Sequence, residues 1–200
     1  MNYYEILNWT HLIAIWGCAV LLLVLDFRGM LSTKTLKFVI IVLLAYLLLN
    51  AILMVPLQWY AWKASPATRN LLGAYNPANA GYFSFYVFKK FFVPVILAFG
   101  SAFVFGGVLF AVEKYSKARW ICREEVLLGA IAALLVGWPS AVLLISFSFC
   151  LTAVASLVMF IMRRKDRLPI APFIYISLLT LLIWGNQFIT IFGLNVIRNA

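Results

Sequence analysis

The sequence predicts an all-α integral membrane protein with six transmembrane helices in a single domain, residues 1–200. Of its 200 residues, 66% are hydrophobic and only 11% are charged, whereas a soluble domain has about 45–50% apolar and about 25% charged residues. The apolar residues also gather in runs close to the ~20 residues that one membrane-spanning helix needs. This composition leaves too little polar surface for a water-soluble globule and excludes the soluble fold classes.

The first three spans are predicted at 9–25, 38–55 and 91–112. A polar, basic connection separates the first two. We expect the second span to end at Pro56, because proline lacks the N–H group that a helix interior needs, and the third to tolerate Pro94 near its start. Between them, 57–90 is rich in turn-forming residues and in the aromatic residues that favour a membrane–water interface, which indicates a long extracytoplasmic loop.

The last three spans follow from one long uncharged stretch, 126–162, and a final apolar run. A single helix over that stretch would be ~55 Å long, far more than the ~30 Å of hydrocarbon in a bilayer. Gly137-Trp138-Pro139 is the natural place for a turn. The sequence therefore predicts a short fourth span at 125–138, a fifth at 140–162 and a sixth at 170–192.

The basic residues predict the orientation of these spans. Eleven of the 16 lysines and arginines lie in the three connections 26–37, 113–124 and 163–169, and such connections face the cytoplasm. We therefore expect a multi-pass protein of the cytoplasmic (inner) membrane with both termini outside the cytoplasm. The net charge of +10 then reports topology and contact with the lipid bilayer, and we expect no nucleic-acid partner.

Few residues indicate a metal or cofactor site. The three cysteines form no Cys-x-x-Cys motif, which favours neither a zinc site nor a disulfide framework. His11 is the only histidine, and we interpret it as an interfacial residue and not a ligand. Asn50 and Gln187 are expected to form hydrogen bonds between helices. We predict neither a cofactor nor a metal.

Two acidic positions could carry chemistry. Asp26 ends the first span, and Glu124-Glu125 opens the fourth, so Asp26 and Glu125 are expected at one cytoplasmic surface. Aspartyl proteolysis needs two carboxyl groups close enough to share a proton, one activating water and the other protonating the leaving group. The alternative is structural: Asp26 is neutralised by Arg28, and the glutamate pair is solvated beside Arg123.

Several short motifs give this chain a family resemblance. They are Asp26-Phe27-Arg28 with Leu31 and Leu36, Gly137-Trp138 after a short helix, Arg163-Arg164-Lys165, Pro169-Ile170-Ala171-Pro172-Phe173, and Trp184-Gly185. Over about 10–56 and 91–190 the chain resembles the membrane domain of prepilin and preflagellin peptidases, the Gly-x-Gly-Asp membrane aspartyl proteases. The resemblance implies a prepilin-peptidase-like helical bundle with Asp26 and Glu125 at the catalytic positions.

The chain also departs from that family at its second catalytic motif. Cys122-Arg123-Glu124-Glu125 stands where the family has Gly-x-Gly-Asp, so both glycines are lost and glutamate replaces aspartate. A shift of about 1 Å at a reacting group can cost on the order of a hundredfold in rate. We therefore expect a non-proteolytic structural or accessory subunit that binds pilin-like or other membrane helices in a pilus or secretion-type assembly. The alternative is an active prepilin peptidase that cleaves leader peptides with Asp26 and Glu125.

Overall fold

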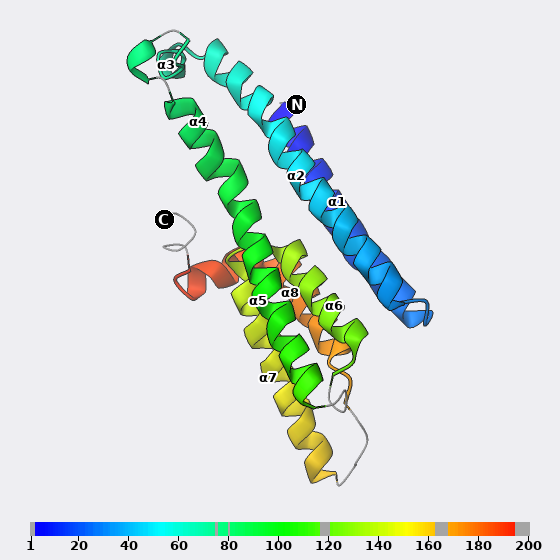
Figure 1. The fold of residues 1–200 in the computed structure, drawn as a ribbon. Coiled ribbons are helices and arrows are strands. Elements are labelled where there is room, and N and C mark those ends of the chain that lie inside the picture. Colours follow the sequence, from blue (N-terminus) through cyan, green and yellow to red (C-terminus); the bar gives the residue numbers. More distant parts are fainter. Residues whose placement is uncertain (1–2, 75, 80, 117–120, 163–167, 195–200) are drawn as a thin grey trace.

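The computed structural model describes residues 3–74, 76–79, 81–116, 121–162 and 168–194. These residues form helices and no strand (Figure 1). Five helical segments are long and apolar enough to cross a membrane, and many of their large apolar side chains are exposed. The chain is therefore a multi-pass, all-α membrane protein whose exposed apolar faces suit contact with lipid.

The second span is longer than the sequence predicted. α1 covers Tyr3–Phe27, and α2 covers Thr33–Ala64, continuing through Pro56, so the expected end at that proline was wrong. Proline in a helix interior costs about 3 kcal/mol. Beyond it, however, α2 buries Trp62, and burial of a tryptophan (~150–250 Å²) contributes about 4–6 kcal/mol. Packing of the added turns therefore outweighs the lost hydrogen bond.

The expected extracytoplasmic loop at 57–90 is mostly helical, which corrects that prediction. After α2 come α3 (Pro66–Arg69), a 3₁₀ turn (Pro77–Asn79) and α4 (Tyr82–Val87). The aromatic residues that suggested an interfacial loop instead pack against one another. The Trp62 ring lies 5.3 Å from that of Phe83 and 4.7 Å from that of Tyr86, and these contacts hold α4 against the end of α2.

The third span begins earlier than predicted because a wide turn accommodates its proline. α4 leads directly into a π-helical turn (Phe88–Phe92) and then α5 (Val93–Tyr115). The N–H group of Val93 donates to the carbonyl of Phe88, five residues back. Pro94 has no N–H group to donate and fits a place where the regular helical ladder is already interrupted.

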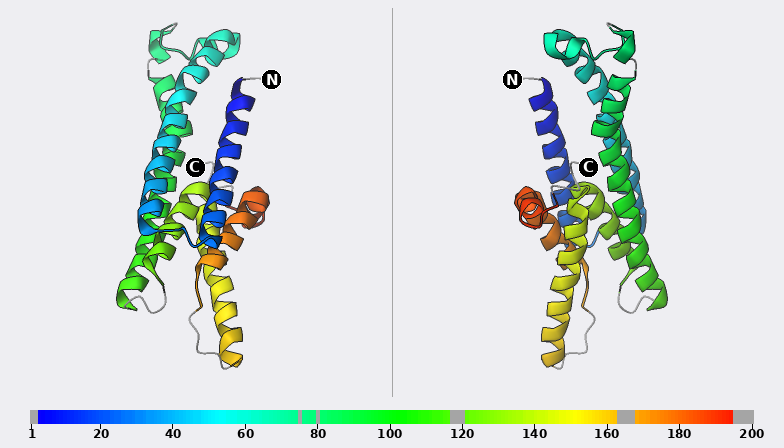
Figure 2. Two further views of the ribbon diagram at one scale, coloured as in Figure 1. Left: turned by 90° about the vertical axis from the view of Figure 1, so that its right-hand side faces the viewer. Right: turned by 90° about the vertical axis from the view of Figure 1, so that its left-hand side faces the viewer.

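A short central helix, α6 (Arg123–Val136), contacts each of the five long helices. It has 14 residues and is only ~21 Å long, less than the ~30 Å of a bilayer core. The predicted fourth span is thus shorter than a full membrane-spanning helix, and among the described residues five helical segments are long enough to cross a bilayer. Most side chains of α6 are buried. This helix therefore lies inside the bundle, between the α2–α5 pair and α8 (Figure 2).

The predicted turn at 137–139 is present and sets the depth of the remaining helices. Gly137 has φ 64°, a left-handed conformation that glycine adopts without strain. The chain then reverses into α7 (Ser140–Ile161), and α8 (Ala171–Ile191) packs along it. Since α7 is ~33 Å long and α6 ~21 Å, the far end of α7 extends past the start of α6 (Figure 1).

Candidate functional site

The end of α1 and the starts of α6 and α8 enclose a pocket of about 280 Å³, here called the acidic pocket. Asp26, Glu124 and Glu125 all line it. The structure therefore agrees with the expectation that Asp26 and Glu125 lie at one end of the bundle. The other lining residues are Leu31, Cys122, Leu128, Pro169, Ala171 and Pro172.

Glu125 joins two helices through its carboxylate. Its side chain is buried, with 4% exposure. Oε2 accepts a hydrogen bond from the backbone N–H of Cys122 at 2.8 Å, which completes a capping box at the start of α6. Oε1 accepts from the N–H groups of Ile170 at 2.8 Å and Ala171 at 3.4 Å, at the start of α8. One carboxylate thus satisfies otherwise unpaired donors at two helix N-termini.

This arrangement explains why glutamate occupies the position. In a capping box the third helical residue reaches back to the backbone N–H of the cap, and glutamate has the required length. The site is also buried and α7 extends past it (Figure 1), and a carboxylate in such a place needs partners from the protein or from water. The extra methylene relative to aspartate therefore serves a structural role here.

Asp26 is exposed at the rim of the acidic pocket. Its carboxylate interacts with the hydroxyl of Tyr175, a buried residue of α8, and that hydroxyl also donates to the carbonyl of Leu22 at 3.2 Å. Leu22 and Asp26 are four residues apart and so share one face of α1. Sequence reasoning did not select Tyr175. The feature that could have identified it is its place in an apolar helix, where a buried tyrosine hydroxyl needs a hydrogen-bond partner.

Glu124 ties the acidic pocket to α2. Oε1 accepts a hydrogen bond from the Thr33 hydroxyl at 2.6 Å. This hydrogen bond, followed by one from a backbone N–H, lowers the pKa of Glu124 below its usual value of 4.5. The contact holds the start of α6 against the start of α2.

If Asp26 and the glutamate pair were purely structural, the sequence predicted Arg28 and Arg123 as their neighbours, and the structure shows different contacts. Arg123 pairs with Glu113 at 3.1 Å and lies over the ring of Phe110, with 4.6 Å from Cζ to the ring centroid. It does not pair with the glutamates of the acidic pocket in the described part of the chain. Nor does an ion pair join Asp26 to Arg28 there. The expected neutralisation of Asp26 by Arg28 was therefore wrong, and so was the expected solvation of the glutamate pair, because Glu125 is buried.

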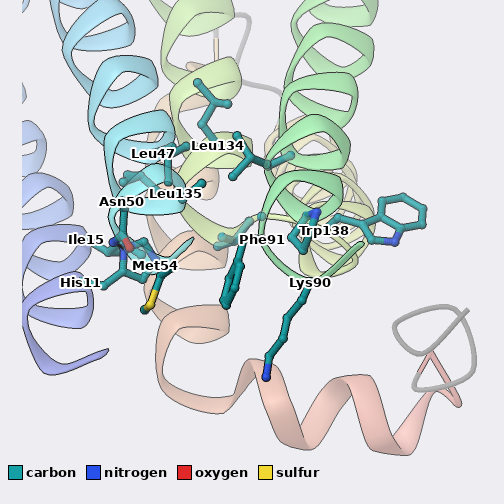
Figure 3. Close-up of a pocket in the computed structure, with 16 residues that line it drawn as sticks. His11, Ile15, Leu47, Asn50, Met54, Lys90, Phe91, Leu134, Leu135 and Trp138 are labelled. Atoms are coloured by element: carbon teal, nitrogen blue, oxygen red, sulfur yellow. Dashed lines mark hydrogen bonds between the residues drawn. The ribbon is translucent and has the colours of Figure 1, made fainter. Parts of the chain in front are cut away.

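A second cavity of about 370 Å³ lies at the other end of α6, among α1, α2 and α5 (Figure 3). Asn50 donates from Nδ2 to Nδ1 of His11 at 3.1 Å, which confirms the predicted inter-helix hydrogen bond of Asn50. The same ring nitrogen lies 3.3 Å from the hydroxyl of Tyr46, and the two rings stack. His11 thus connects α1 to α2.

The hydrogen bonds of Glu125 constrain what the acidic pocket can do. Both oxygens of Glu125 accept backbone N–H groups, which fixes the orientation of this carboxylate toward the starts of α6 and α8, while each oxygen keeps a second lone pair. Among residues that the structure describes, no three His, Cys, Asp or Glu side chains are grouped to hold a metal ion.

No protein-family model matches this chain, and no curated protein or solved structure matches it at a significant level.

Proposed function

We propose that this protein is a non-proteolytic subunit on a prepilin-peptidase-like scaffold. The observation that carries the proposal is the Glu125 carboxylate. At the position where the resemblance expects a catalytic aspartate, it caps α6 and α8 at the same time. A group held this way stabilises the bundle, and releasing it to activate water would leave buried N–H groups of two helices unsatisfied.

In this proposal the subunit binds a pilin-like or other membrane helix in a pilus or secretion-type assembly. Support comes from a notch of about 240 Å³ on the surface between α5 and α7. Gly100 lies in it, and a Cβ atom there would meet nothing within 4 Å. Small residues let helix backbones approach closely in a membrane, so a partner helix can lie across the notch and place a side chain in it. The protein would lie in the cytoplasmic membrane, and because α6 and α7 form a hairpin whose two ends face the same side, both termini would lie outside the cytoplasm.

A crosslinking experiment tests the binding role. A photoreactive amino acid at Val142, an exposed residue of the notch, should capture a co-expressed pilin-like helix in the membrane. Gly100→Leu, which fills the notch, should reduce the yield at least fivefold. Gly17→Leu on α1, where a Cβ atom also meets nothing, is the matched control. Equal yields in all three proteins, or no capture at all, would contradict this binding role.

The second candidate function is an active aspartyl peptidase, favoured by the placement of Asp26 and Glu125 in one pocket. Purified protein and a pilin-like substrate with its leader peptide distinguish the two functions. The proposal expects no cleavage. Cleavage that is lost in Asp26→Asn and in Glu125→Gln, yet kept in Glu113→Gln, would establish the peptidase and overturn the non-proteolytic assignment. Glu113 pairs with Arg123 outside the acidic pocket, so its substitution controls for loss of charge.

A further inference from the structure

The cavity beside His11 is built from four helices and has a largely apolar wall. Leu47 and Met54 of α2, Val95 of α5 and Leu134 of α6 contribute to that wall. Figure 3 shows His11, Asn50 and Met54 together on one side and Lys90 and Trp138 on the other. The cavity thus combines apolar packing surface with a few polar groups, which is the usual composition of a ligand site.

Its size decides between two kinds of occupant. The volume is about 370 Å³, at the lower end of the roughly 300–1,000 Å³ typical of small-ligand pockets. A helix about 10 Å wide and ~15 Å long occupies roughly 1,200 Å³, more than three times the available space. A single flexible apolar chain fits this cavity, and a transmembrane helix does not.

Lys90 lies where a lipid headgroup would be. Between Lys90 and Glu113, the stretch 91–112 carries no charge. The two charged residues are separated by ~35 Å along the helix, which brackets the ~30 Å hydrocarbon core. Lys90 therefore lies at the interface at one end of this span, and the apolar wall below it extends toward the hydrocarbon.

The Lys90 ammonium group is held in place by aromatic residues. Nζ donates to the hydroxyl of Tyr86 at 2.6 Å and lies 5.9 Å from the ring centroid of Phe91. An ammonium group has three donors, so it can also donate to an anion. None of the described residues that line the cavity is acidic. The charge at the rim therefore favours a negative headgroup.

We propose that this cavity binds one acyl chain of an anionic phospholipid, with the phosphate of the headgroup at Lys90. The apolar wall takes the chain, Lys90 donates a charge-assisted hydrogen bond to the phosphate, and its positive charge disfavours a headgroup that carries a cation of its own. The site lies at the opposite end of α6 from the acidic pocket. It is independent of the proposed helix-binding role.

Lipid retention by the purified full-length protein tests this site. The protein in detergent is incubated with dioleoyl phosphatidylglycerol or dioleoyl phosphatidylcholine, and bound lipid is counted by native mass spectrometry. We expect about a tenfold preference for phosphatidylglycerol, because both lipids offer a phosphate but phosphatidylcholine also carries a trimethylammonium group that the Lys90 ammonium repels. Lys90→Gln should abolish the preference. Lys89→Gln, which removes the same charge from the next residue, should keep it.

A second pair of variants tests the acyl-chain site. Val95→Trp fills the cavity and should reduce retention of both lipids at least fivefold, whereas Ile96→Trp alters an exposed neighbour outside the cavity and should not. Equal retention in these two variants, or equal losses in Lys89→Gln and Lys90→Gln, would overturn the proposal. So would displacement of phosphatidylglycerol by millimolar inorganic phosphate, since that result would indicate a site for a free anion.

Discussion

Replacing Glu125 with alanine should destabilise the bundle more than any other loss of an acidic side chain at the acidic pocket. The substitution removes the only carboxylate that accepts hydrogen bonds from the starts of both α6 and α8 in the described structure. It leaves the N–H groups of Cys122 and Ile170 without that acceptor, at a place where the side chain was 4% exposed. The effect therefore follows from structure and needs no catalytic role.

The two short hydrogen bonds set the magnitude. Each joins a backbone N–H group to Glu125 at 2.8 Å, and hydrogen bonds to charged groups contribute about 1.5–3 kcal/mol each. We therefore expect Glu125→Ala to lower the free energy of unfolding by about 3–6 kcal/mol, or the midpoint of thermal unfolding by about 6–24 °C for a chain of this size. Glu125→Gln keeps one acceptor oxygen and should lose about half as much.

Unfolding of the purified variants in mixed micelles, followed by circular dichroism, measures these changes. Glu124→Ala is the matched control, because Glu124 is adjacent, lines the same pocket and accepts a side-chain hydrogen bond from Thr33. It should cost about 1–2 kcal/mol, because it loses one hydrogen bond to a charged group, and that group is only partly buried. If Glu125→Ala were no more destabilising than Glu124→Ala, the carboxylate would not be joining the two helices, and the main support for a non-proteolytic subunit would be lost.

Two further predictions concern packing and pH. Gly129→Ala should lower the free energy of unfolding by about 1–3 kcal/mol through overpacking, because the new Cβ would lie 2.5 Å from Cδ1 of the buried Leu109. Gly107 has open space around it, so Gly107→Ala should be neutral or slightly stabilising in the same unfolding assay. Because the pKa of Glu124 is lowered in the folded state, its contribution to stability is complete above pH 4.5 and is lost as the pH falls through the folded-state pKa. Thr33→Val removes the donor responsible and should flatten this loss in an acid titration of the unfolding midpoint, whereas an unchanged slope would refute the assignment.

The composition of the chain was enough to predict a multi-pass helical membrane protein. The apolar runs also located the cores of five helices. Gly137-Trp138-Pro139 identified a turn, because the positive φ of the glycine and the missing N–H group of the proline together end a helix whatever the rest of the fold does. The errors arose where packing outweighed local preference. Burial of Trp62 carried α2 past Pro56, and a wide turn before Pro94 extended the next helix toward α4.

The sequence by itself thus determined the membrane class and the approximate spans, because hydrophobicity is a property of the linear chain. The resemblance of Asp26 and Glu125 to a peptidase pair stays a prediction. Only the tertiary structure decided what Glu125 contacts. Its partner Ile170 lies 45 residues away, at the start of a helix whose position depends on how α6 and α8 pack. A hydrogen bond between such distant segments depends on the assembled bundle, and local sequence patterns do not contain it.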